Sequence, residues 1–341
     1  MERANKLGIA LIIIFLLGFF LWAVMPKDDF NSKIFKEILE QKDQADIVFK
    51  DATLAEIYDG IKYWELISKS SAINKSFGRA DMNDVDGLFF DNGKPTIKFL
   101  APSAIWYMKK NEISLNEPIG YDVKYDKTIR AELAKVKDIQ HIYSVFHLPD
   151  KNTGKAYKGY WFQAKKLNWR LATKKLICSG NILLTKDNVV INAGKLEADV
   201  GMEKVMLTER PSAEIASNGD KIMITAKEIY VDSFSDIIMA KDKVTLTKGT
   251  ATISTSKLLY DQKNDFVEMT GNVYVSDKYI TAFSNVASYD IKNNKVSLVG
   301  KAKAKRENNE IFGDKMTIFL GQNKIIVEGK TKATIKETEV E

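Results

Sequence analysis

Few residues that carry chemistry occur in this sequence. Its 341 residues include one cysteine and two histidines, and they contain no glycine-rich phosphate loop, nucleophile elbow or zinc-ligand spacing. One cysteine allows neither an internal disulfide nor a thiolate cluster. Cys178 lies on the apolar side of an expected strand, where it is predicted to be a small core residue. We therefore expect no metal, no cofactor and no enzymatic activity.

The histidines and acidic residues form no recognisable site. His141 and His147 lie about 20 Å apart if they share a strand, which is too far for one metal ion. Asp81–Gly87 is similar to a calcium loop, but valine stands at its fifth position and no glutamate at the twelfth. A polysaccharide-active enzyme would need two carboxylates within about 5–10 Å of each other. Four tyrosine–aspartate pairs are interpreted instead as turn signals where strands meet hairpins: Tyr58-Asp59, Tyr121-Asp122, Tyr260-Asp261 and Tyr289-Asp290.

Positive charge is present but not clustered. The formal net charge is +6, yet lysines alternate with glutamate and aspartate along the chain. A nucleic-acid-binding surface gathers arginine and lysine on one face and interleaves them with aromatic residues. We therefore expect no nucleic acid among the partners of this protein.

Charge is absent from one long segment near the N-terminus. Residues 7–26 contain no charged side chain, and as a helix they span about 30 Å, the thickness of a bilayer core. Arg3 and Lys6 precede the segment, whereas Asp28 and Asp29 follow it. The excess of positive charge before the segment predicts a single-pass anchor in the inner membrane, with residues 1–6 in the cytoplasm and the bulk of the chain outside.

The residues at the end of this segment and just after it also bear on the prediction of a membrane anchor. A cleaved signal peptide would need small residues at the cleavage site, and Trp22–Pro26 supplies a poor one. Residues 27–45 are polar with some helical spacing, and they fit either a short amphipathic helix or a disordered stalk. We expect an uncleaved anchor followed by a juxtamembrane linker.

From Phe162 to Ile335 the sequence repeats one strand-pair pattern. The clearest copy, Ile253–Ser276, turns over at Asp261–Asp265 and returns with small or apolar residues at every second position. Strand side chains point alternately to opposite faces, so one face is apolar and the other polar. Successive copies begin with the same short motif at steps of 29, 33, 29, 27 and 31 residues. Such a period predicts stacked antiparallel hairpins that bury their apolar faces together.

A glycine recurs in the middle of the return strands. It stands in phase in four of the six copies, and Asp242 and Arg210–Pro211 replace it in the other two. A glycine inside a strand favours a bulge or a bend. We therefore predict a bend at the same place in each copy, at Gly180, Gly271, Gly300 and Gly329.

Residues 46–150 show a weaker form of the pattern. Phe99–Ala104 fits the first strand of a copy, and Ile113–Leu115 with Val123–Tyr125 would lie on its return side. Ile129–Ala134 fits a degenerate copy or a helical turn. Lys151–Lys155 is a loop, and we place there the boundary between this part and the regular array of residues 151–341, with no long linker and one continuous sheet system.

The apolar face of the repeats is the candidate functional surface. This face forms either a closed core, or the interior of a sheet that is folded over on itself and accepts acyl chains. The periodicity of the sequence fits both alternatives. The predicted lining residues are Phe99, Trp106, Phe162, Leu176, Ile182, Leu184, Val244, Leu246, Val267, Met269, Val273, Val275, Val296 and Leu298. The last strand offers an edge for strand addition by a partner at Ile325, Val327, Ala333 and Ile335.

Several segments resemble one family of lipopolysaccharide-export proteins. The anchor, Thr53–Ile73 (TLAEIYDGIKYWELISKSSAI) and Leu88–Lys124 resemble LptC, and repeats such as Ala251–Val275 (ATISTSKLLYDQKNDFVEMTGNVYV) also resemble LptA and the OstA-like domain. The resemblance implies an all-β protein, an elongated antiparallel β-jellyroll of two facing twisted sheets. It also implies that the protein receives lipopolysaccharide, or a related glycolipid, from an ATP-driven LptB–LptF–LptG complex and passes it towards the outer membrane.

The chain departs from LptC in its length, because an LptA-like array follows the LptC-like part. About nine copies at about 4.8 Å each give a groove of about 43 Å, which is shorter than the gap this family bridges. We therefore expect bridging by an LptA-like protein or by further copies. The alternative is a membrane-tethered structural β-solenoid with a filled core and no lipid cargo.

Overall fold

The part of the chain that can be described lies after the N-terminal segment. Contacts divide the chain into two units, Met1–Asp46 and Ile47–Glu341. Within the second unit, the computed structural model describes residues 47–127, 160–186, 188–217, 220–232, 235–278, 280–306, 309–322 and 324–335. No helix in these ranges is long and apolar enough to cross a membrane.

Several predictions concern residues outside these ranges and stay predictions. They are the anchor at residues 7–26, the linker at residues 27–45, the degenerate copy at Ile129–Ala134, the loop at Lys151–Lys155, and His141 and His147.

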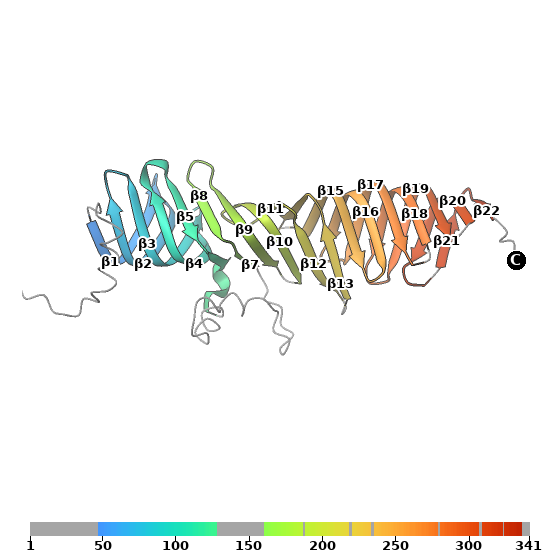
Figure 1. Cartoon of the computed structure of the whole chain (residues 1–341), viewed down its shortest axis with the longest axis horizontal. Coiled ribbons are helices and arrows are strands. Elements are labelled where there is room, and N and C mark those ends of the chain that lie inside the picture. Colours follow the sequence, from blue (N-terminus) through green and yellow to red (C-terminus); the bar gives the residue numbers. More distant parts are fainter. Residues whose placement is uncertain are drawn as a thin grey trace, which may run out of the picture. The chain divides into compact units, whose positions relative to one another are not determined.

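Antiparallel strands form nearly all of the first part of the described chain (Figure 1). The strands are β1 (Ile47–Tyr58), β2 (Ile61–Asn74), β3 (Arg79–Asp91), β4 (Lys94–Tyr107), β5 (Glu112–Asn116) and β6 (Ile119–Asp122), with short 3-10 turns η1 (Met108–Lys110) and η2 (Val123–Tyr125). The prediction that Val123–Tyr125 lies in a return strand is wrong. The return strand β6 ends at Asp122, whose carboxylate accepts a hydrogen bond from the Lys124 backbone and begins the η2 turn.

The described strands of the repeat array begin with β7. Its strands are β7 (Tyr160–Gln163), β8 (Lys166–Arg170), β9 (Lys175–Lys186), β10 (Val189–Asp199), β11 (Lys204–Thr208), β12 (Ser212–Ser217), β13 (Asp220–Thr225), β14 (Glu228–Asp232), β15 (Ile237–Lys248), β16 (Ala251–Asp261), β17 (Phe266–Asp277), β18 (Ile280–Asp290), β19 (Lys295–Arg306), β20 (Asn309–Phe319), β21 (Lys324–Glu328) and β22 (Lys332–Thr334). All pairings among these strands are antiparallel.

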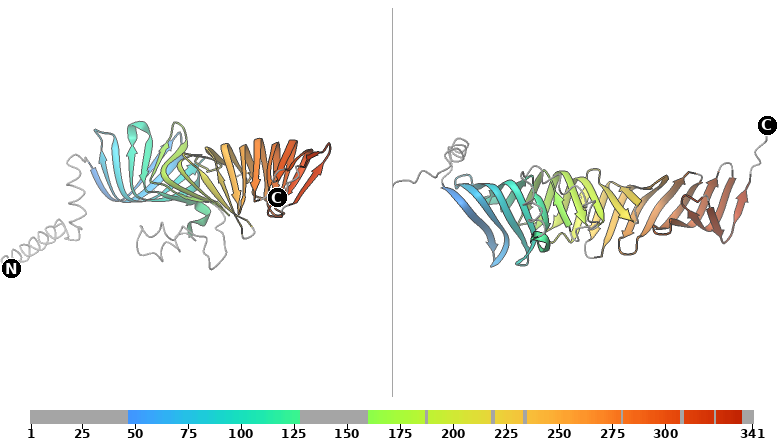
Figure 2. Two further views of the ribbon diagram at one scale, coloured as in Figure 1. Left: turned by 45° about the vertical axis from the view of Figure 1, so that its right-hand side comes forward. Right: turned by 90° about the horizontal axis from the view of Figure 1, so that it is seen from below.

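Each long strand belongs to two layers. In β9, Lys175–Ser179 pairs with β8 and with the second half of β10. Its other half pairs with the first half of β10, and Leu183–Lys186 of that half also pairs with β7. The same division recurs along the array (Figure 2). We call the layer that contains β5, β8, β11, β14 and β21 layer 1, and the layer that contains β6, β7, β12, β13 and β22 layer 2.

The strands pass from layer 1 to layer 2 at the predicted bends. Gly180, Gly271, Gly300 and Gly329 have φ angles of 75°, 86°, 81° and 86°, which L side chains rarely adopt. The pairing register shifts at these points, for example between Thr270 and Val273 of β17. The two copies without the glycine bend at Asp242–Lys243 and at Glu209–Arg210, again with positive φ. The prediction of a bend in every copy is confirmed.

Hydrogen bonds link the N-terminal strands to the array. β4 pairs with β5 through one half and with β6 through the other, and these two strands pair with β8 and β7 respectively. Strand pairing therefore continues from β1 to β22 through both layers. Where the first part ends and the array begins stays a prediction.

Inward side chains of both layers form one hydrophobic core. In β17, Val267, Met269, Val273 and Val275 are buried, while the residues between them are not. Cys178 is completely buried, as predicted for a core residue. Turns follow the predicted signals as well, since the carboxylate of Asp261 accepts hydrogen bonds from the backbone of Lys263 and Asn264.

Candidate functional site

The predicted lining residues all face the space between the layers. Trp106 is partly buried and packs against the core. The other thirteen are buried, with at most 2% of each side chain exposed: Phe99, Phe162, Leu176, Ile182, Leu184, Val244, Leu246, Val267, Met269, Val273, Val275, Val296 and Leu298. The structure brings these residues together on one continuous apolar face, and their contact with a guest molecule stays a prediction.

The protein's own side chains fill this interior. At the N-terminal end, Phe89 lies 4.7 Å from Phe99 and 5.8 Å from Trp169, measured between ring centroids. Phe89 and Phe99 belong to layer 2 and Trp169 to layer 1, so the two layers are in direct contact. A small void of about 10 Å³ lies between the layers under Leu184 and Ile238, which is about the space of one water molecule.

The layers meet again opposite the bends, along a line that we call the seam. There the hairpins of layer 1 contact the strand ends of layer 2. The Thr96 hydroxyl donates to the Val200 carbonyl at 3.2 Å, and the Asp277 carboxylate accepts from the Gly321 backbone at 2.8 Å. The Lys186 ammonium lies 2.9 Å from Asp236.

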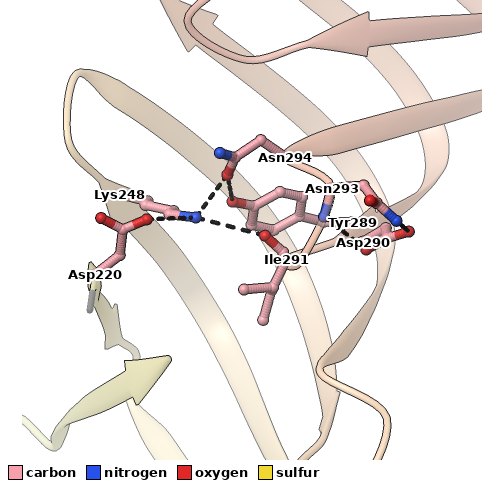
Figure 3. A network of polar contacts seen from close by, with 7 residues as sticks. All are labelled: Asp220, Lys248, Tyr289, Asp290, Ile291, Asn293 and Asn294. Carbon is pink, nitrogen blue, oxygen red and sulfur yellow. Dashed lines mark hydrogen bonds and ion pairs between the residues drawn. The ribbon is translucent and has the colours of Figure 1, made fainter. Parts of the chain in front are cut away.

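The most extensive polar network of the seam surrounds Lys248 (Figure 3). Its ammonium lies 3.1 Å from Asp220 and donates to the Asn294 side chain at 2.5 Å and to the Ile291 carbonyl at 3.5 Å. Only 11% of the Lys248 side chain is exposed. The Tyr289 hydroxyl donates to the same Asn294 oxygen at 3.1 Å. The network therefore ties the end of β15 in layer 2 to the β18–β19 hairpin in layer 1.

Buried tyrosines lie beside the turns that follow β6, β16 and β18. Each hydrogen-bonds a residue five positions later, which closes the turn. Burial raises the pKa of the Tyr260 and Tyr289 hydroxyls above the ordinary tyrosine value. The pairs are Tyr121 with Asp126, Tyr260 with Asp265, and Tyr289 with Asn294. Sequence reasoning identified these turns but missed the tyrosine hydroxyls as their inner support, although the fixed spacing of five carries that signal.

Sequence reasoning also missed an apolar hollow on the outer face of layer 1. The hollow has a volume of about 770 Å³ and contains Met206, Tyr230, Met239 and Leu259. These residues are neighbours across four strands, since Met206 pairs with Tyr230, Tyr230 with Met239, and Met239 with Leu259. The outer face was expected to be polar throughout. In the sequence, this apolar part of the outer face shows as two consecutive apolar residues where one of the two should be polar, as in Leu258-Leu259.

The two ends of the strand series have unpaired edges. β1 pairs only with β2, and β21 and β22 pair only with β20 among the described strands. Of the predicted edge residues, Ile325 and Val327 pack partly against the core, whereas Ala333 and Ile335 are exposed. The position of this edge is as expected, and its use by a partner stays a prediction.

Residues with metal-binding side chains do not gather in the described ranges, where no group of three or more histidine, cysteine, aspartate or glutamate residues has suitable geometry.

One acidic residue is buried near the N-terminal end: Glu56 accepts a hydrogen bond from the Trp64 indole at 2.5 Å, and burial raises the pKa of the Glu56 carboxyl.

The repeat array also matches a known family model. The model described as "LptA/(LptD N-terminal domain) LPS transport protein" matches residues 162–278 and 223–324, two overlapping stretches that extend from β7 into β21. Residues 162–324 resemble LptA. The match covers the array only, so the LptC-like character of the preceding strands stays a prediction.

A solved structure gives a weaker likeness. LptH of Pseudomonas aeruginosa, described as the LptA homologous periplasmic component of the lipopolysaccharide transport device, is 18% identical to the chain with a TM-score of 0.31. The alignment covers 34% of this chain and 95% of LptH. No curated protein matched the sequence.

Proposed function

We propose that this protein is a lipid conduit anchored in the inner membrane. It accepts lipopolysaccharide, or a related glycolipid, and shields the acyl chains between its two layers on the way to the outer membrane. The observation that carries the proposal is the repeated inward apolar face, built from a part of the chain that matches the LptA family model.

Burial of apolar surface supplies the binding energy in this proposal. An acyl chain of about a dozen methylenes gains roughly 10 kcal/mol when it leaves water, at about 0.8 kcal/mol per methylene. Because the interior is filled, a guest must replace contacts between side chains of the two layers, so the net gain is smaller. Similar inward residues in successive copies give similar affinities from one copy to the next, which allows the lipid to move along the array.

The remaining parts of the proposal concern partners. The uncharged segment at residues 7–26 holds the chain in the inner membrane, and a separate ABC transporter of the LptB–LptF–LptG type supplies the energy. The protein itself performs no covalent chemistry. An LptA-like bridge or another copy adds to the free edge at β21 and β22.

A photo-crosslinker tests which face contacts lipid. Val273 faces inward and is buried, whereas the next residue, Tyr274, lies on the outer face against Phe283 with ring centroids 4.7 Å apart. The crosslinker at position 273 should capture lipid in cells, and the same group at position 274 should not. Capture at position 274 alone would contradict the proposal.

The filled interior favours a second candidate, the anchored structural scaffold without cargo. The thirteen predicted lining residues with at most 2% exposure would then be core residues only. Native mass spectrometry of the purified full-length chain separates the two candidates. Bound lipid in the spectrum supports the conduit, and its consistent absence, with no lipid captured at position 273, supports the scaffold.

A further inference from the structure

One position recurs where each layer 1 hairpin closes over the interior. It is the residue that directly follows the strand, and its backbone N–H donates to the preceding hairpin: Gln262 to the Asp236 carbonyl at 3.1 Å, Ile291 to Asp265 at 3.2 Å, and Leu320 to Asn294 at 3.0 Å. We call this the capping position. Leu171 makes the same bond to the Asn111 carbonyl at 3.1 Å, and Val200 is the residue that directly follows β10.

Gln262 is the polar exception at this position. Val200, Ile291 and Leu320 are buried apolar residues that cover the edge of the core. The amide oxygen and nitrogen of Gln262 are also inaccessible to solvent, and neither has a hydrogen-bond partner among the described residues. A buried polar group without a partner costs stability, so an isoleucine or leucine here would give a more stable hairpin.

A void lined by inward residues of both layers lies beside this amide. It is enclosed by Leu184, Val189 and Ile191 of layer 2 and by Val231, Ile238 and Gln262 of layer 1, and Lys186 completes its wall. Lys186 is paired with Asp236, whose side chain is 49% exposed and whose carbonyl accepts from the Gln262 backbone. An unsatisfied amide, an apolar void and a seam cation therefore lie together.

We propose that this place is the binding position for an N-acyl amphiphile with a phosphate head group. The proposal rests on the conduit function proposed above and names the part of the lipid that is recognised. An amide-linked acyl group presents one carbonyl acceptor and one N–H donor, which match the free nitrogen and oxygen of Gln262. Its hydrocarbon chain enters between the layers at the void, and its phosphate replaces Asp236 as the partner of Lys186. Because the void is small, the layers separate locally as the chain enters.

Two probes of equal chain length test the match to the amide. N-dodecanoyl-aminoethyl phosphate carries the amide, whereas dodecyl phosphate lacks it. Each is titrated against the full-length protein in a fluorinated surfactant and followed by native mass spectrometry. The wild-type protein should bind the N-acyl probe about tenfold more tightly than the alkyl probe, the effect of one or two hydrogen bonds.

Three variants and one control separate the contribution of the amide from that of the cation. Gln262→Ile, which introduces the residue of the next copy, should abolish the preference between the probes and raise the melting temperature. Gln262→Met is the second variant, with a shape closer to glutamine. Lys186→Met should weaken both probes about tenfold without changing the preference. Lys221→Met removes an exposed cation paired with Glu214 and should change neither affinity.

The outcomes distinguish this proposal from the conduit function. If Gln262→Ile and Gln262→Met keep the wild-type preference for the N-acyl probe, the assignment of Gln262 is wrong, while the conduit stands. If the wild-type protein binds neither probe, both the binding position and the proposed function are overturned.

Discussion

Single side chains at the seam decide how firmly the two layers are held together. The Lys248 ammonium contacts three oxygen atoms, one in β13 and two in the β18–β19 hairpin, while only 11% of its side chain is exposed. Exposed ion pairs contribute little to stability, but partly buried charged hydrogen bonds contribute more. The lysines of the seam therefore differ in effect from lysines on the outer faces.

Lys248→Met should lower the free energy of unfolding by about 1–2 kcal/mol, because the hydrogen bonds to Asn294 and Ile291 are lost. Urea denaturation followed by circular dichroism measures the change. Lys221→Met is the control, since the Lys221 side chain is 76% exposed, and it should stay within about 0.5 kcal/mol of wild type. Equal effects of the two substitutions would show that the network around Lys248 adds nothing.

The buried tyrosines predict a response to alkaline pH. Burial holds the pKa of Tyr289 above its ordinary value, so the folded protein keeps a proton that the unfolded chain releases above about pH 10. Rising pH then favours the unfolded chain. Tyr289→Phe should be less stable than wild type at neutral pH, through loss of the bond to Asn294, but its stability should fall less steeply above pH 10. Parallel pH profiles would contradict this assignment.

At the scale of the element, the bend lets each long strand of a hairpin pass from layer 1 into layer 2. Glycine permits the positive φ at this point, but crowding differs between copies. A Cβ atom on Gly271 would lie 2.9 Å from the Ser256 side chain, whereas a Cβ on Gly300 would meet nothing closer than Asn285 at 3.8 Å. The two positions share the backbone conformation and differ in the space beside it.

Alanine substitutions at these two glycines distinguish the cost of backbone strain from the cost of side-chain crowding. Gly300→Ala should cost about 1 kcal/mol, the strain of a left-handed conformation for an L residue. Gly271→Ala should cost more, because Ser256 must also move. Thermal unfolding of the two variants measures both values. If Gly300→Ala were the more damaging, the crowding at Gly271 would be irrelevant.

The elements were largely predictable from the sequence, and their contacts across the seam were not. Alternation in Val267–Val275 gives the strand and its inward face, and the in-phase glycines give the bend, because both are local properties of the chain. Thr96 meets Val200 over a separation of 104 residues, and Lys186 meets Asp236 over 50. Such pairs depend on the stagger between the layers, which no local pattern encodes.

The apolar hollow on layer 1 escaped prediction for a related reason. Met206 and Tyr230 become neighbours only through the pairing of β11 with β14, which are separated in sequence by the β12–β13 hairpin of layer 2. In the same way, Gln262 is an ordinary hairpin residue in the sequence. Its lack of a partner is visible only when the opposite layer covers it.

For the whole molecule, the proposed conduit requires the two layers to separate before a lipid can enter the filled interior, and we propose that they separate at the seam. Cysteines at positions 96 and 200, joined by a short thiol cross-linker, should hold the seam closed at that point and reduce lipid capture by a photo-crosslinker at position 99. Burial raises the pKa of the single native cysteine, Cys178, so its thiol does not compete for the reagent.

The control joins two strands within one layer. Positions 283 and 303 are direct partners in the pairing of β18 with β19, and a cross-link between them leaves the seam free to open. This cross-link should not change lipid capture. Equal capture before and after closure of the 96–200 pair would mean that lipid enters elsewhere.

The bend has a consequence for how such a chain can change its length. Because every long strand crosses the bend, one extra hairpin unit of about 30 residues adds two strands to both layers at once, which is about 10 Å of length in each layer. The two layers then lengthen by the same number of strands, so no strand in one layer lacks its continuation in the other. Duplication of a whole unit would extend the molecule and loss of one would shorten it, while every remaining strand would still have a neighbour in its layer.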